Sequence, residues 1–247
     1  MSSLRLSSTF TPHPGVLVVA PFAMVFARFG LAVLFQALTA GVLWLQGATH
    51  PWQAAAPWWT VYGSLIDGVC LVALVWLLRA EGMTLRSVVD FQRRRIGRDL
   101  LLALALLALF LVLGFGGGAL AGALLYGGPP PTPMGGLPRW AALYSVVIWP
   151  LLWAFTEQLV YLGYALPRVR GALDSASLAI GVVALGWALQ HTALPLLPDA
   201  RFILYRFLAT LPFAVVIPIF LRVRRLPAFM AAHWAIDALA AAITVWS

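Results

Sequence analysis

The sequence contains no lysine, a single cysteine and few charged residues of either sign. Charged side chains make up 10% of the chain and hydrophobic side chains 62%, whereas soluble globular domains average about 25% and about 45–50%. Because Cys70 has no second cysteine to pair with, an intrachain disulfide is excluded, and we interpret it as a packed core thiol. The scarcity of charge excludes an ordinary soluble domain.

Apolar runs long enough to cross a bilayer recur to the C-terminus. Since a spanning helix needs about 20 apolar residues, we predict an all-α, polytopic transmembrane helical bundle of about seven spans. It forms a single transmembrane domain over residues 1–247, and the first apolar run is too long for a cleaved signal peptide. The expected spans are roughly 20–46, 57–78, 100–126, 140–166, 176–197, 202–221 and 227–246.

The arginines collect in alternate loops, which argues for membrane topology and against a nucleic-acid partner. The loops after the second, fourth and sixth expected spans contain Arg79, Arg86, Arg93, Arg94, Arg95, Arg98, Arg168, Arg170, Arg222, Arg224 and Arg225. The intervening loops contain only Arg139 and Arg201, and one of them carries a stiff proline-rich connector at 129–133. The positive-inside rule therefore predicts a cytoplasmic N-terminus in a multi-pass protein of a cell membrane, most simply the bacterial inner membrane.

Four ionisable residues lie inside the apolar stretches of three expected spans. A charge at the bilayer centre costs about 3 kcal/mol on insertion scales, so such residues face protein and usually serve a function. The four are Glu157, His191, His233 and Asp237. His233 and Asp237 are four residues apart and share one helix face. A helical bundle would let all four converge.

These residue types suit hydrolysis of an amide. A carboxylate removed from water can act as general base or acid, and a neighbouring histidine can share a water molecule with it. A second histidine, one turn from a carboxylate, can donate a hydrogen bond to a developing oxyanion. The same residue types could instead bind a divalent metal. A fifth buried acid, Asp67, is expected to pair with Arg28 in the first span.

Three motifs carry a resemblance to a known family. Glu157-Gln158-x-x-Tyr161-Leu162-Gly163, Trp187-x-x-x-His191 and His233-x-x-x-Asp237 resemble the motifs of the CPBP family, in the same order. That family comprises the CAAX prenyl endopeptidases and the bacteriocin-processing or Abi-type proteins. The resemblance covers roughly residues 149–241, within a catalytic core expected at about 140–247.

The resemblance implies a glutamate-type intramembrane protease that acts on a peptide or protein substrate at the lipid bilayer. By position, Glu157 would activate the water and His191 would hold or share it. His233 and Asp237 would stabilise the oxyanion. Family members are often labelled metalloproteases, but this mechanism requires no metal, and we expect neither a metal nor a cofactor.

Two positions depart from the family pattern. Gln158 stands where the family has a second glutamate, and Leu162 stands where it has an arginine. Their joint loss would remove an ion pair as a unit, and Arg206 in the sixth span is a candidate replacement cation. The departures keep open a catalytically silent scaffold or bacteriocin-immunity protein of the same fold. Buried acids and histidines also fit a proton-coupled transporter.

The expected boundaries place Glu157 toward the cytoplasmic side of its span and His191 toward the outer side. At 1.5 Å per residue, the difference in depth is on the order of 10 Å. Helix tilt and shifted boundaries can remove this difference. The separation of the four polar groups is therefore the main structural test of the prediction.

Overall fold

The computed structural model describes residues 16–132, 134–220 and 226–246, and these residues form helices and short connections without any strand. The predicted helical membrane fold is confirmed. The elements, in chain order, are α1 (Val16–Leu45), α2 (Pro51–Ala55), η1 (Ala56–Trp58), α3 (Trp59–Ala80), α4 (Leu85–Val89), η2 (Arg93–Arg95), α5 (Ile96–Leu111), η3 (Val112–Gly116), α6 (Gly117–Tyr126), α7 (Arg139–Val147), α8 (Trp149–Gln158), η4 (Leu159–Ala165), α9 (Leu166–Leu173), α10 (Ala176–Thr192), α11 (Ala200–Phe220) and α12 (Leu226–Trp246).

Six helical segments of the described chain are long and apolar enough to cross a membrane. They are Val18–Leu45, Pro51–Ala80, Leu85–Tyr126, Arg139–Leu173, Ala200–Ile219 and Leu226–Val245. The remaining expected span, the fifth, is α10, an apolar helix of 17 residues that ends at Thr192 rather than at residue 197. It ends early because Pro195 disfavours helical geometry at the residue before it and supplies no backbone N–H.

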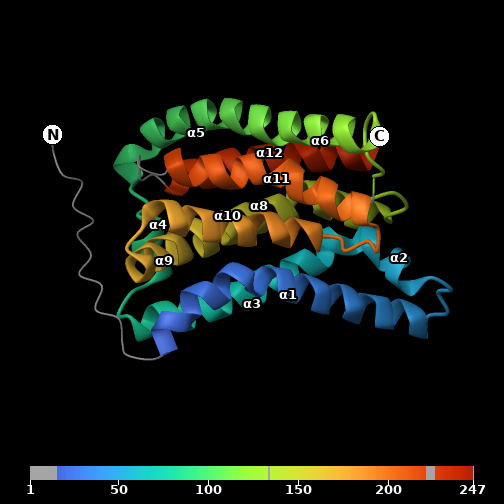
Figure 1. Ribbon diagram of the computed structural model, residues 1–247, viewed down its shortest axis with the longest axis horizontal. Helices are drawn as coiled ribbons and strands as arrows, with labels where there is room; N and C mark the ends of the chain where they lie inside the picture. Colours follow the sequence, from blue (N-terminus) through green and yellow to red (C-terminus); the bar gives the residue numbers. More distant parts are fainter. Residues whose placement is uncertain (1–15, 133, 221–225, 247) are drawn as a thin grey trace.

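The helices stack in layers, with α8, η4, α9 and α10 in the interior (Figure 1). One side of this interior layer is covered by α1 and α3, and the other by α11 and α12, behind which α5 and α6 pack. The interior position explains why the fourth span is the most buried of the six, since it meets protein rather than lipid on most sides. Residues presented by α8 and η4 are therefore shielded from lipid.

The two ends of the bundle differ in charge. The end that carries α4, η2 and α9, at the left of Figure 1, is called the arginine-rich end; its described arginines are Arg79, Arg86, Arg93, Arg94, Arg95, Arg98, Arg168 and Arg170. The opposite end, which carries α2 and the C-terminal part of α6, is called the arginine-poor end and has Arg139 and Arg201. Arg222, Arg224 and Arg225 lie outside the described residues. The cytoplasmic location of the arginine-rich end stays a prediction.

Two local features shape the fourth span. A break at Ile148 separates α7 from α8, because the ring of Pro150 in the first turn of α8 cannot continue a regular helix. Directly after Glu157 and Gln158, the helix widens into the π-helix η4. Such π-helical turns inside α-helices are frequent at functional sites. The wider turn changes the direction of the side chains that follow.

Candidate active site

The structure brings the four predicted residues together from three helices. Glu157 in α8 is central: its Oε1 lies 3.6 Å from Nε2 of His191, near the end of α10. Its Oε2 lies 3.3 Å from Nε2 of His233 in α12. The same nitrogen of His233 lies 3.3 Å from Oδ2 of Asp237. The four groups form one continuous cluster, and their catalytic roles stay a prediction.

The depth difference of about 10 Å that the expected boundaries give is not observed. The fourth helix continues to Leu173, well past the expected end at residue 166, while α10 begins at Ala176 as expected. Glu157 thus lies 16 residues before Leu173, and His191 lies 15 residues after Ala176. At 1.5 Å per residue, both are about 24 Å from the arginine-rich end. Equal depth allows the two side chains to meet.

Gln190 fixes one oxygen of the Glu157 carboxylate. Its Nε2 donates a hydrogen bond to Oε1 of Glu157, and its own Oε1 accepts one from Nε of Arg28. Glu157 is 0% exposed, and its second oxygen, Oε2, makes no hydrogen bond within the part of the chain that the structure describes. One carboxylate oxygen is therefore held, while the other faces His233 and remains available to a reacting molecule.

The predicted pair of Arg28 and Asp67 is confirmed, and it supports the site. Nη1 of Arg28 donates to Oδ1 of Asp67 at 2.7 Å, and both residues are buried. The guanidinium of Arg28 also lies 4.2 Å above the ring of Trp153, in a cation–π arrangement. Because a guanidinium only donates, the amide of Gln190 must turn its oxygen toward Arg28, which directs its NH2 group at Glu157.

A close crossing of α1 and α10 makes this network possible. Gly186 lies one turn before Gln190, and a Cβ atom at that position would meet the backbone oxygen of Val25 at 2.6 Å. Val25 lies one turn before Arg28 in α1. Only glycine allows so short a distance between the two backbones, and the crossing brings Arg28 to Gln190. The hydroxyl of Tyr161 lies at the same crossing, 3.2 Å from Oε1 of Gln190.

Gln158 contacts the imidazole of His233. Its Nε2 lies 2.9 Å from Nδ1 of His233, and an amide NH2 group donates. Nδ1 then accepts, so the proton of the neutral ring resides on Nε2, which faces Glu157 and Asp237. The amide thus selects a tautomer in which His233 is a donor toward the centre of the cluster.

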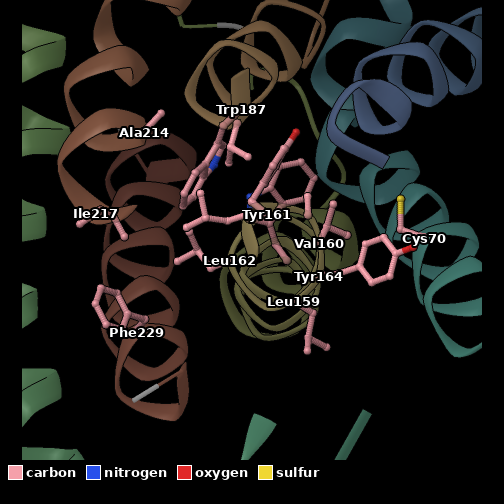
Figure 2. Packing of buried hydrophobic residues seen from close by; sticks show 14 of the residues in the cluster. Cys70, Leu159, Val160, Tyr161, Leu162, Tyr164, Trp187, Ala214, Ile217 and Phe229 are labelled. Atoms are coloured by element: carbon pink, nitrogen blue, oxygen red, sulfur yellow. The ribbon is translucent and has the colours of Figure 1, made fainter. Parts of the chain in front are cut away.

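Leu162 is packed as an apolar residue. It is 3% exposed and lies among Trp187, Ile217 and Phe229 in the apolar core (Figure 2). This surrounding offers no partner for the arginine that the family has at this position. The neutral pair of Gln158 and Leu162 therefore replaces the charged pair of the family without stranding a charge.

Arg206 does not take the place of the missing arginine. Its Nε donates to the backbone oxygen of His191 at 3.0 Å, and its Nη2 donates to that of Leu194 at 2.8 Å. These carbonyl groups lie at the C-terminal end of α10 and just beyond it, where helical partners are lacking. The side chain thus fixes the helix end that carries His191, and the proposed replacement of the family arginine was wrong.

A cavity of about 330 Å³ adjoins the cluster on the side of the arginine-poor end. His191, Arg206 and Asp237 line this cavity, and aromatic rings form much of its wall. The aromatic wall consists of Trp59, Trp149, Trp153, Phe202 and Tyr205. A peptide segment with apolar side chains would find a matching surface beside the cluster.

The cluster does not form a metal-binding arrangement. Among the described residues, no group of three or more His, Cys, Asp or Glu side chains is placed to hold a metal ion. The expectation that catalysis needs no metal stays a prediction.

Sequence reasoning missed part of the site. Gln190, which holds Glu157, was not singled out, although a buried amide beside His191 in an apolar helix is itself a signal. Arg28 and Asp67 were predicted as a structural pair only, because nothing in their spacing connects them to α10. Their link to Glu157 depends on the crossing of α1 and α10.

Comparison with known families identifies the C-terminal part of the chain. Residues 138–239 match the family model of the type II CAAX prenyl endopeptidases, Rce1-like. This segment contains all four residues of the cluster and leaves α1 and α3 outside the match. The predicted resemblance to the CPBP family is confirmed over these residues. Neither the curated proteins nor the solved structures give a match.

Proposed function

We propose that this protein is an intramembrane endopeptidase that uses Glu157 and His191 to activate water. The single observation that carries the proposal is the contact of Glu157 with both His191 and His233, at 3.6 and 3.3 Å, in a buried cluster beside a cavity. The family match over the same residues supports it. Substrates are expected to be peptides or proteins that present a cleavable bond close to the membrane.

In the proposed reaction, a water molecule between Glu157 and His191 gives a proton to the carboxylate as its oxygen attacks the peptide carbonyl. The carbonyl oxygen becomes an oxyanion and receives a hydrogen bond from Nε2 of His233. Asp237, whose Oδ2 lies 3.3 Å from the same nitrogen, orients this donor. The proton on Glu157 then passes to the amide nitrogen, the C–N bond breaks, and a carboxylic acid and an amine leave.

The decisive experiment compares the wild-type protein with Glu157→Gln in proteoliposomes, using a prenylated CAAX peptide and a bacteriocin leader peptide as substrates. Removal of a general base lowers kcat by about 100- to 10,000-fold, and His191→Ala is expected to act in the same way. Isotopically labelled water should introduce its oxygen into the new carboxyl group. The exposed Asp174→Asn is the matched control and should leave cleavage unchanged. Equal cleavage by Glu157→Gln would refute the assignment.

A catalytically silent scaffold or immunity protein is the second candidate, and one observation favours it. The family's charged pair is replaced by Gln158 and by Leu162, which lies in an apolar environment. If no substrate is cleaved, and if Glu157→Gln leaves the biological phenotype of the wild type intact, the silent function is supported. Glu157-dependent cleavage excludes it.

A proton-coupled transporter fits the arrangement less well. The described cavity reaches the cluster from the arginine-poor end. Toward the other end, Leu159, Val160 and Leu162 of η4 are buried in the apolar core (Figure 2). A transporter needs a polar path to both faces, and this apolar packing interrupts the path between Glu157 and the arginine-rich end.

A further inference from the structure

The cavity beside the cluster contains a cation, Arg206, that no Asp or Glu side chain neutralises among the residues that the structure describes. All eight Asp and Glu residues lie in the described part of the chain, and among these residues none forms an ion pair with Arg206. The guanidinium uses Nε and Nη2 to donate to the carbonyl oxygens of His191 and Leu194. Its remaining donors have no such partner, and the side chain lines the cavity.

The position of Arg206 relates it to the reaction. The carbonyl that its Nε contacts belongs to His191, the residue proposed to hold the water. His191 and Arg206 also line the same cavity, so a group bound by the guanidinium would lie in the cavity that adjoins the proposed catalytic residues. A planar guanidinium presents paired N–H groups that match the two oxygens of a carboxylate, and such charge-assisted bonds are strong away from water.

The mouth of the cavity lies at the arginine-poor end. The cavity is lined there by the proline-rich connector, of which Pro129, Pro131 and Thr132 are exposed. This connector follows the end of α6, at the right of Figure 1, opposite α4 and α9. The positive-inside rule predicts that the arginine-rich end is cytoplasmic, and on that prediction the mouth faces away from the cytoplasm.

We propose, on the basis of the function proposed above, that the cavity admits substrate from the extracytoplasmic side and that Arg206 binds a substrate carboxylate there. The substrate class is a peptide with apolar side chains and a carboxylate close to the scissile bond. The aromatic wall takes the apolar side chains, and Arg206 takes the carboxylate. The carboxylate belongs either to the peptide's C-terminus or to an acidic side chain, and both sources present the same group.

Binding can be tested without catalysis. The Glu157→Gln protein in neutral detergent is titrated with four probes: N-acetyl-trileucine as free acid and as amide, and N-acetyl-Leu-Asp-Leu-amide and its Asn counterpart. Trp59, Trp149 and Trp153 line the cavity, so their fluorescence reports occupancy. The carboxylate member of at least one pair is expected to bind about 10- to 100-fold more tightly than its neutral partner. The pair that shows the difference identifies the source of the carboxylate.

Substitutions then assign the preference to Arg206. Arg206→Gln keeps a donor but removes the charge, so the ratio between acid and neutral probes should fall to about one, while Arg206→Lys should retain part of it. Arg201→Met, at the exposed arginine of the same end, is the matched control and should keep the full ratio. Equal binding of acid and neutral probes by the Glu157→Gln protein overturns the carboxylate subsite, even if the substituted proteins fail to fold. Cleavage that depends on Glu157 could still be present, so the two proposals fail separately.

Sidedness is tested with single cysteines, because Cys70 is 1% exposed and should not react. Thr132→Cys reports the mouth of the cavity, and Ser87→Cys, exposed in α4, reports the opposite end. In spheroplasts of a bacterial expression host, a membrane-impermeant maleimide should label Thr132→Cys at once and Ser87→Cys only after permeabilisation. Labelling in the reverse order overturns extracytoplasmic access.

Discussion

The ion pair of Arg28 and Asp67 offers a quantitative test of how the N-terminal helices support the site. At 2.7 Å, and with an effective dielectric constant of about 20, the attraction between the two charges is about 6 kcal/mol. Desolvation of both groups offsets much of it, so removing one partner of a buried pair costs about 3–5 kcal/mol, chiefly because the other charge is stranded. Arg28→Met and Asp67→Asn should each lower the free energy of unfolding by about this amount.

The double variant Arg28→Met/Asp67→Asn strands no charge, so its loss of stability should fall below the sum of the single losses by at least about 2 kcal/mol. Unfolding in mixed detergent micelles, followed by tryptophan fluorescence, measures all four proteins of the cycle. Losses that add to within about 0.5 kcal/mol would refute the coupling.

Measurement of kcat distinguishes a positioning role of Arg28 from a contribution to stability alone. In the double variant, Gln190 loses the donor that orients its amide toward Glu157, so kcat should fall by about 10- to 100-fold while the protein remains folded. The pair of Arg168 and Glu81, at the arginine-rich end, is the matched control. Its double variant, Arg168→Met/Glu81→Gln, should show a similar stability cycle with kcat unchanged. Equal kcat in the two double variants would show that Arg28 contributes to stability but does not position Glu157.

Two further substitutions test the close crossing of α1 and α10 and the uncharged side chain of Gln158 beside His233. Gly186→Ala places a Cβ 2.6 Å from the backbone oxygen of Val25 and should destabilise the protein by about 1–3 kcal/mol. Gly181→Ala, with open space around it, is the control and should stabilise the helix by up to about 1 kcal/mol. Equal shifts of the melting temperature in the two variants would contradict the close crossing. Gln158→Glu adds an unpaired buried carboxylate beside His233 and should lower the free energy of unfolding by about 3 kcal/mol or more. Wild-type stability in that variant would show that a cation lies within reach of the new carboxylate.

The match to the endopeptidase family covers the cluster but not everything that holds it. Glu157 receives its hydrogen bond from Gln190 inside the matched segment, and Gln190 in turn depends on Arg28 outside it. A truncated protein that begins near residue 138 would retain all the motif residues. It would lack the guanidinium that orients the amide and the helix that packs against Gly186. We therefore expect the N-terminal helices to be part of the functional unit.

The sequence by itself determined the membrane class, the number of apolar helices and the four residues of the cluster. Apolar length and buried charge are energetic properties of a local segment, and they can be read without knowing its neighbours. The order of the motifs that contain Glu157, His191 and His233 along the chain was sufficient to predict the family that residues 138–239 match. Span ends were less accurate where a proline or a π-helical turn altered the helix, as at Pro195 and η4.

Only the tertiary structure decided how these residues work together. The meeting of Glu157 and His191 depends on where α9 ends and α10 begins, and the link to Arg28 depends on a backbone crossing at Gly186. The contact of Arg28 with Gln190 joins residues 162 positions apart, so no local pattern encodes it. The tertiary structure also showed that Arg206, predicted as a replacement for the family's arginine, lines the cavity. Buried charges show that a site exists, whereas packing determines which neighbour holds each one.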